Sequence, residues 1–395
     1  MGLEVEELTT QFQTRKVTLL ALTHAVHDTY TGFLPALLPV LIEKFTLTNA
    51  AAGLLTLFLR LPSLLQPLIG RIADRKNMKL LIILSPAITG AGMSLLGVAP
   101  SYGFIIFLLI LVGVSSASLH AVTPVLSSTF SGDKLGRGMS FWMVGGEMGR
   151  ALGPVVIVST ISFLELEGLP WLAFGGGLMS LFLAQRLSAV TTITAKASEN
   201  IALKTALKEM RWVLLPITVL IFTRSMVTAT LTTFLPTFLR EEGASLWFAG
   251  VSLTVLEIAG MIGAFMAGSL SDRLGRRRML FISYIVTPII MFLFVQSNAL
   301  LRIPILQLLG FFSLSVTPVI LAVVLENASV NRSFANGIFM AVSFLIQALA
   351  TLMVGFISDL VDLRFTFLLS AALLPVGILV IRLLPDGSSK AALNN

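Results

Sequence analysis

Long apolar runs alternate with short polar breaks along this whole chain. A helix needs about 20 mostly apolar residues to cross the hydrocarbon core of a membrane. Such runs are predicted near 17–41, 50–70, 79–99, 102–129, 138–163, 168–187, 212–239, 246–269, 280–297, 302–325, 334–357 and 364–384. Apolar residues do not alternate at every second position, as they would in the strands of a membrane barrel. The pattern predicts an all-α membrane protein with twelve transmembrane helices.

The composition indicates that lipid is the solvent for most of the chain. The 395 residues have a mean hydropathy of +0.93 and only 12% are charged, against roughly 25% in a soluble domain. The net charge of +7 does not indicate a nucleic-acid partner, because the basic residues occupy short loops rather than one face. With no cysteine and only three histidines, we expect neither a metal site nor a cofactor.

Lysine and arginine residues predict the orientation of the chain. With the N-terminus inside, the inner segments hold 20 of the 27 basic residues. The outer loops hold only Lys44, Arg240, Arg302 and Arg364. The positive-inside rule then places both termini in the cytoplasm of a bacterial-type inner membrane.

A repeated motif predicts two similar halves. One copy follows the second span, and the other follows the eighth span, 198 residues later. The first copy contains Gly70, Asp74 and Arg75, and the second contains Gly268, Asp272, Arg273 and Arg276. The longest polar stretch lies between spans six and seven. We therefore expect a six-helix bundle over 1–187, a cytoplasmic linker over 188–211, and a second six-helix bundle with a short cytoplasmic tail over 212–395. Parallel repeats of this kind hold a small-molecule substrate at their interface near mid-membrane.

The repeated G-x-x-x-D-R-x-G-R-R loop resembles the signature loop of the major facilitator superfamily. The second copy is a full match, whereas the first has Asn77 and Met78 where Gly and Arg are usual. In that family the Asp and Arg of this loop latch the two halves on the cytoplasmic side, so the resemblance implies a gating role for these residues. The alternative is a basic turn that serves membrane topology alone.

Other segments resemble the fosmidomycin resistance group within that superfamily. They are Leu22-Thr-His24-x-x-His27-Asp28, Leu64-Leu-Gln-Pro67, Leu119-His120 and Val144-Gly-Gly-x-x-Gly149-x-x-x-Gly153-Pro154. The group usually has Asn where His27 stands and Pro where Ala121 stands. The resemblance implies export of a phosphonate antibiotic and related small molecules in exchange for protons, and function as a monomer.

Asp28 is the first candidate for proton coupling, because an ionisable side chain at bilayer depth is costly and usually functional. His24 lies one helical turn earlier on the same face, and His24 or His27 can tune or share a proton. The alternative is a static hydrogen-bonded pair that holds helices together. His120 lies in the fourth span, where a structural role and a substrate-binding role are equally open.

Three arginines and two further acids also fall within spans. We assign Glu147 and Glu257 to proton coupling with Asp28, and His24, His27, Arg60, His120, Arg150 and Arg224 to substrate binding. Arginine stays charged at any working pH, so it can bind an anion but cannot carry the coupling proton. Glu147 and Arg150, three residues apart, are expected to pair. From their equivalent positions in the two halves, we further expect Asp28 to face Arg224 and Arg60 to face Glu257.

The fifth span carries Gly145, Gly149 and Gly153 at four-residue spacing, followed by Pro154. Small residues on one stripe allow a close helix approach, and proline adds a kink. The G-x-x-x-G-P core also resembles the antiporter motif of proton-coupled exporters, although Ile157 and Val158 stand where that motif has glycines. The four tryptophans fall near predicted span ends, as an interfacial belt would place them.

These features predict a proton-coupled antiporter that exports small amphipathic or anionic compounds by alternating access, and not an enzyme. An importer or facilitator of an organic anion or metabolite needs the same arginines but not the G-x-x-x-G-P core. A membrane-embedded acyltransferase, suggested by the pair His24 and Asp28, is a remote alternative. That pair lies in mid-span, and no nucleophile with a base accompanies it.

Overall fold

The computed structural model describes residues 11–73, 78–187, 203–326 and 332–384, and every regular element within them is helical. Most of the helices are α-helices, with short 3₁₀ and π segments between some of them. In chain order they are α1 (Thr14–Thr31), α2 (Phe33–Phe45), α3 (Asn49–Arg60), η1 (Leu61–Leu65), α4 (Gln66–Ala73), α5 (Lys79–Ser94), α6 (Tyr102–Ser131), α7 (Leu135–Leu164), η2 (Leu166–Leu172), α8 (Ala173–Leu187), α9 (Leu203–Ala229), η3 (Thr230–Phe234), α10 (Leu235–Glu241), α11 (Leu246–Leu274), α12 (Arg276–Gln296), α13 (Ala299–Leu314), α14 (Val316–Glu326), α15 (Arg332–Leu360), α16 (Leu363–Leu373) and α17 (Val376–Ile381).

The predicted all-helical membrane fold is confirmed. Among the described residues, 9 helical stretches are long and apolar enough to cross a membrane, and the count of twelve spans stays a prediction. Several predicted spans consist of two helices in succession, such as α1 with α2 and α13 with α14. Breaks of this kind follow from glycine and proline, which interrupt the regular backbone hydrogen bonds. Gly32 separates α1 from α2, and Pro62 lies in the 3₁₀ turn that ends α3.

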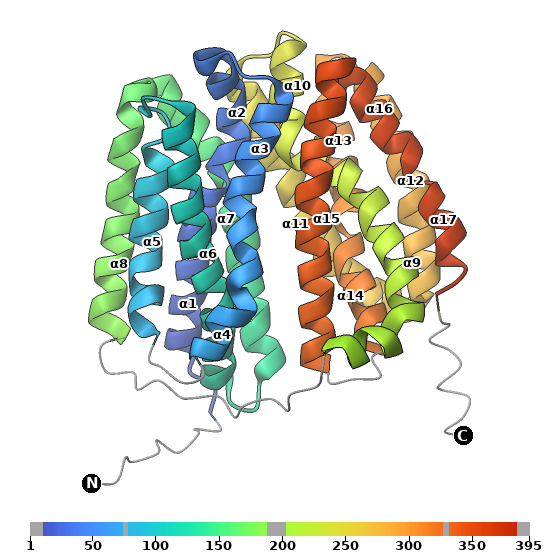
Figure 1. The fold of residues 1–395 in the computed structure, drawn as a ribbon, viewed down its shortest axis with the longest axis horizontal. Helices are drawn as coiled ribbons and strands as arrows, with labels where there is room; N and C mark the ends of the chain where they lie inside the picture. Colours follow the sequence, from blue (N-terminus) through green and yellow to red (C-terminus); the bar gives the residue numbers. More distant parts are fainter. Residues whose placement is uncertain (1–10, 74–77, 188–202, 327–331, 385–395) are drawn as a thin grey trace. The chain divides into compact units, whose positions relative to one another are not determined.

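The chain forms two compact units. The first comprises 1–33, 62–156 and 160–197, and the second comprises 34–61, 157–159 and 198–395. In the first unit α1 packs against α5, α6 and α8, and α5 packs against α6 and α8; Figure 1 shows these helices in blue to green. Its core includes Val17, Leu20, Leu119 and Leu183. The exposed large apolar side chains on the outer faces of both units suit a lipid environment.

In the second unit α11 packs along α13, α12 contacts α13 and α16, and α9 contacts α15 and α17. The helix α9 begins at Leu203, so the last part of the predicted 188–211 linker is helical. Residues 188–202 lie outside the described part of the chain. The predicted boundaries of the two bundles stay a prediction.

Residues 34–61 belong to the second unit because α3 packs along α15. Glycines bring the two backbones close: a Cβ atom on Gly53 would lie 3.1 Å from the carbonyl oxygen of Thr351. The carboxylate of Asp359, near the end of α15, accepts the backbone N–H groups of Asn49 at 2.7 Å and Ala50 at 2.8 Å. These N–H groups begin α3 and have no partner within their own helix. One carboxylate therefore caps α3 from another helix.

We expect Asp359→Ala to lower the unfolding temperature of the protein in nanodiscs. The substitution leaves two N–H groups at the positive end of α3 without an acceptor, at a cost of about 1 kcal/mol. Asp133→Ala, which removes an exposed carboxylate between α6 and α7, is the matched control. Equal unfolding temperatures for the two variants would show that the cap contributes nothing.

Candidate functional site

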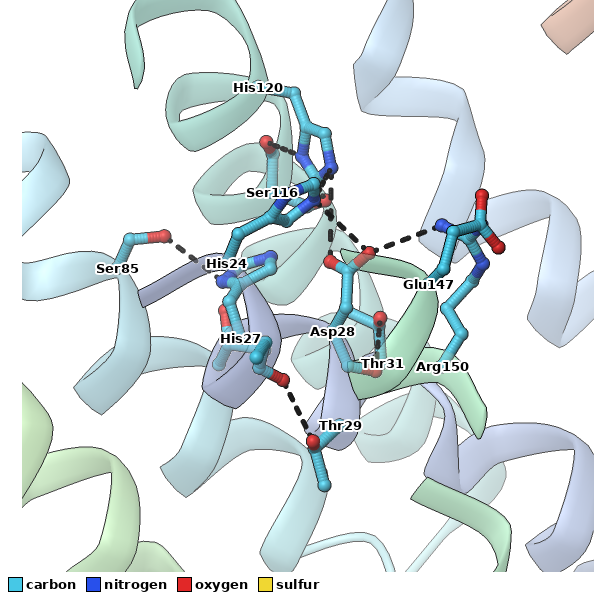
Figure 2. A network of polar contacts seen from close by, with 12 residues as sticks. His24, His27, Asp28, Thr29, Thr31, Ser85, Ser116, His120, Glu147 and Arg150 are labelled. Atoms are coloured by element: carbon cyan, nitrogen blue, oxygen red, sulfur yellow. Dashed lines mark hydrogen bonds and ion pairs between the residues drawn. The ribbon is translucent and has the colours of Figure 1, made fainter. Parts of the chain in front are cut away.

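A network of polar side chains lies inside the first unit, around Asp28 on α1 (Figure 2). The side chain of Asp28 is only 5% exposed. His24, one turn earlier on the same helix, places Nε2 at 3.3 Å from Oδ2 of Asp28. His120 on α6 places Nε2 at 3.8 Å from Oδ1. Two imidazoles from two helices therefore face one buried carboxylate, whose charge needs compensation at this depth.

The hydrogen bonds of the two imidazoles fix which ring nitrogens carry protons. His24 Nδ1 lies 2.9 Å from the carbonyl oxygen of Trp142, and His120 Nδ1 lies 2.9 Å from the carbonyl oxygen of Ser116. A carbonyl oxygen only accepts, so each Nδ1 must donate. In a neutral imidazole the other nitrogen, Nε2, then has a lone pair and no proton. We assign these tautomers from the network.

With these tautomers, hydrogen-bond acceptors of His24, His120 and Asp28 meet at one point. The Nε2 atoms of His24 and His120 lie 3.1 Å apart, and both face the carboxylate oxygens of Asp28. With neutral imidazoles and an ionised carboxylate, these atoms would offer only lone pairs to one another. A hydrogen bond needs one proton between its two heavy atoms. The cluster therefore lacks a donor between the two imidazoles, which one added proton could supply.

Arg150 and Glu147, both on α7, extend the network towards the surface of the unit. Nη1 of Arg150 donates to Oδ2 of Asp28 at 3.4 Å, and Nη2 of Arg150 forms an ion pair with Glu147. The Arg150 side chain is 42% exposed and that of Glu147 is 27% exposed. The guanidinium thus stands between a buried and an accessible carboxylate, and it can also reach a solute.

His27 takes a different place from the other two histidines. It is completely buried, and its Nδ1 lies 3.2 Å from the hydroxyl oxygen of Ser85 on α5. That hydroxyl also contacts the hydroxyl of Ser115 at 2.9 Å. His27 therefore joins a hydroxyl cluster behind the acceptor cluster, away from the accessible groups.

A stripe of glycines on α7 sets the distance to α1. A Cβ atom on Gly145 would overlap the carbonyl oxygen of Ala21, one on Gly149 that of Ala25, and one on Gly153 that of Thr29. Without side chains at these positions, the two backbones come into direct contact. Pro154 follows the stripe inside α7. This close approach carries Arg150 to Asp28.

Trp142 is a site residue that the sequence reading missed. Its ring stacks on His24 with centroids 3.7 Å apart and an interplanar angle of 16°. It is only 4% exposed, so the expectation that it belongs to an interfacial belt is wrong. On the facing side, a Cβ atom on Gly146 would overlap the His24 ring. His24 is therefore held in one orientation by a stacked ring and a carbonyl from α7.

The sequence offered one signal for this arrangement, the one-turn spacing of His24 and Asp28. It gave no sign that His120 or Trp142, which are 96 and 118 residues away from His24 in the chain, contact His24. His24, Asp28 and His120 also offer three ligand atoms within 4.8 Å of one another, a set that a divalent transition metal can use. His24 and His27 are only three residues apart, but His27 turns to Ser85 instead.

The remaining charged candidates lie in the second unit. Arg224 is on α9, Glu257 is on α11 and Arg60 ends α3. No carboxylate among the described residues of that unit forms an ion pair with Arg224. The predicted pairings of Asp28 with Arg224 and of Arg60 with Glu257 stay predictions.

Arg276 forms two ion pairs in the second copy of the loop motif. Its Nη2 lies 2.5 Å from a carboxylate oxygen of Asp272 and 2.8 Å from one of Glu326, at the end of α14. Gly275 has φ 92°, a conformation that favours glycine. Gly70 and Gly268 have open space where a Cβ would stand, and Arg273 is exposed. Asp74 and Arg75 of the first copy lie outside the described residues.

The chain is similar in sequence to known membrane transporters. The family model of the Major Facilitator Superfamily matches residues 20–300 and 248–395. The fosmidomycin resistance protein of Escherichia coli (strain K12) is 26% identical over 94% of this chain and 93% of its own length. A multi-drug resistance efflux pump PmrA homolog of Lactococcus lactis is 24% identical over 69% of this chain and 70% of its own.

The fold is also found among solved structures. A bacterial homolog of the human lysosomal transporter Spinster, in an inward-facing and occupied conformation, has a TM-score of 0.81. It is 14% identical and covers 94% of this chain and 96% of its own. The family model and the fosmidomycin resistance protein confirm the family resemblance drawn from the loop motif and the segments around Asp28.

We expect Gly149→Ala to lower the unfolding temperature and to weaken the contact between Arg150 and Asp28. The new methyl group overlaps the backbone of α1, so the helices must separate. Gly177→Ala on α8, where a Cβ meets nothing within 4 Å, is the control. It should be neutral, or stabilising by up to about 1 kcal/mol, because alanine favours helix more than glycine does. Equal effects of both substitutions would rule out a close α1–α7 contact.

Proposed function

The chain belongs to the Major Facilitator Superfamily, and from that premise we propose that it is a proton-coupled antiporter that exports small amphipathic or anionic compounds by alternating access. The family and fold are those of membrane transporters rather than enzymes. We place it in a bacterial-type inner membrane, with both termini in the cytoplasm and a single chain as the working unit. Protons, one small-molecule substrate and the lipid bilayer are its partners.

The convergence of three acceptor groups is the observation that carries the coupling proposal. Nε2 of His24 lies 3.1 Å from Nε2 of His120 and 3.3 Å from the carboxylate of Asp28. Nε2 of His120 lies 3.8 Å from the same carboxylate, and the three groups share no donor when all are deprotonated. One added proton turns this repulsive set into a hydrogen-bonded one. The cluster therefore binds a proton at a defined place and releases it only at an energetic cost that a conformational change can supply.

Protonation also changes the partner of Asp28. With the proton bound, a positive imidazolium beside Asp28 balances the carboxylate charge. Without it, the carboxylate depends on Arg150, which already pairs with Glu147. Among the described residues of the first unit, the other charged and titratable groups next to the cluster are His27 on α1 and Glu147 and Arg150 on α7. Loss of the proton thus draws α1 and α7 together electrostatically, which supplies a difference in free energy between two states.

Efflux is favoured over uptake by two features. Two relatives that match this chain over most of their length are a fosmidomycin resistance protein and a multi-drug resistance efflux pump homolog. The Gly149-x-x-x-Gly153-Pro154 core of α7, which resembles an antiporter motif, lies directly against α1 at the proton site. We assign Arg60 and Arg150 to the substrate, because a fixed positive charge in a membrane cavity attracts an anionic group. Glu257 is assigned to the coupling route with Glu147.

One observation favours a second function, the import of an organic anion together with protons. When an imidazolium balances Asp28, this carboxylate needs less compensation from Arg150, whose guanidinium can then turn to an anion. Proton and anion would then bind together, as symport requires, whereas antiport requires that they bind in different states. The two functions therefore differ in the sign of the proton movement that substrate binding causes.

We expect Asp28→Asn to abolish transport driven by a pH gradient while substrate exchange between the two sides persists. The amide cannot exchange the coupling proton. The measurement is fosmidomycin transport in proteoliposomes with an imposed pH gradient, with EDTA present so that a metal cannot replace the proton. Glu43→Gln, an equivalent change at the exposed end of α2, is the control. If wild-type transport ignores the gradient, the proton coupling is refuted.

Substrate binding to the detergent-solubilised protein should release protons into a weakly buffered solution. This is the result for antiport, since substrate and proton occupy different states. A pH-sensitive dye measures the release, and Asp28→Asn should remove it. Uptake of protons would instead establish the symport of an anion.

A further inference from the structure

We infer that the second unit contains a binding site for a small inorganic anion of halide size, formed by Arg224 and the hydroxyl groups of Thr287 and Ser313. A cavity of about 10 Å³ lies there, roughly the space for one water-sized particle. It is lined by five polar residues and three apolar ones: Arg224, Ser283, Tyr284, Thr287 and Ser313, with Val227, Val316 and Leu374. This site is independent of the proposed direction and coupling of transport.

The hydroxyl residues of this cavity have counterparts at equivalent positions in the first unit. Three hydroxyl residues recur at a separation of 198 residues: Ser85 with Ser283, Thr89 with Thr287, and Ser115 with Ser313. The first member of each pair lies on α5 or α6, and the second on α12 or α13. The separation equals that of the repeated loop motif, so the two hydroxyl triads occupy equivalent positions in the two halves.

In the first unit the triad is closed. The hydroxyl oxygens of Ser85 and Ser115 lie 2.9 Å apart, and Thr89 donates to that of Ser115 at 3.1 Å. His27 completes the group through Ser85. Every hydroxyl of this triad therefore has a partner, and no guest is needed.

In the second unit the equivalent triad is open. Within the described part of the second unit, the hydroxyl oxygens of Thr287 and Ser313 have no hydrogen-bond partner, and neither has Nε of Arg224. Thr287 is 1% exposed and Ser313 is 3% exposed. The hydroxyl of Tyr284 is already used, since it donates to the carbonyl oxygen of Leu220 at 2.7 Å. A buried polar group without a partner costs free energy, so three such groups around one cavity indicate a bound guest.

Charge selects an anion over water as that guest. Arg224 stays charged, and within its unit no described carboxylate forms an ion pair with it. Arg224 is half-buried, and a fixed charge within a membrane span attracts a counter-charge. Two hydroxyl donors and a guanidinium N–H suit a chloride ion, and the small cavity excludes an organic anion.

The test is thermal unfolding of the protein in nanodiscs while sodium chloride replaces sodium gluconate at constant ionic strength. A specific site predicts a saturable rise in the unfolding temperature, because an ion that binds only the folded state stabilises it. Arg224→Gln should abolish the rise. Thr287→Val, which keeps the shape but removes one donor, should raise the half-saturating chloride concentration by about tenfold.

Thr89→Val in the first unit is the matched control, because its hydroxyl occupies the equivalent position but already bonds to Ser115. It should leave the half-saturating concentration unchanged. An unfolding temperature that does not respond to chloride would show that the cavity holds water and would overturn the proposal. The same half-saturation in Thr287→Val and the wild type would overturn the assigned ligands. Neither result bears on proton coupling, which is measured by transport.

Discussion

The burial of one carboxylate, Asp28, is the constraint on which the arrangement of the first unit depends. A charged group at this depth must be balanced by other polar groups. The balance comes from three helices: His24 on α1, His120 on α6 and Arg150 on α7. The glycine stripe of α7 and the stacked ring of Trp142 hold these groups at the required distances. Packing and charge compensation are therefore two parts of the same structure.

The polar groups around Asp28 contain more hydrogen-bond acceptors than donors. Two imidazoles, each fixed by a backbone carbonyl, present lone pairs to the carboxylate and to each other. A static structural pair would need no third acceptor. This excess of acceptors makes the occupancy of the site depend on one proton, and Arg150 connects that occupancy to the accessible end of the network. In the second unit a positive charge, Arg224, lines a cavity together with the unpartnered hydroxyl groups of Thr287 and Ser313.

The fold class and the family could be predicted from the sequence because hydropathy and the loop motif are local properties of the chain. The pairs of Asp28 with His24 and Glu147 with Arg150 also followed from helical spacing. The contribution of His120 and the burial of Trp142 did not follow, because they depend on how α6 and α7 pack against α1. Nor did the α3–α15 contact, which takes residues 34–61 out of the first unit.

Nitrogen-15 NMR of histidine-labelled protein in lipid bilayers tests the central claim most directly, because it reports the protonation of each ring nitrogen. At high pH we predict that His24 and His120 are neutral, with protonated Nδ1 and bare Nε2. As the pH falls, one proton should appear between the two Nε2 atoms, and Asp28→Asn should alter this signal. A proton on Nε2 with a bare Nδ1 in either residue, or no change in either signal over the pH range of transport, would contradict the account.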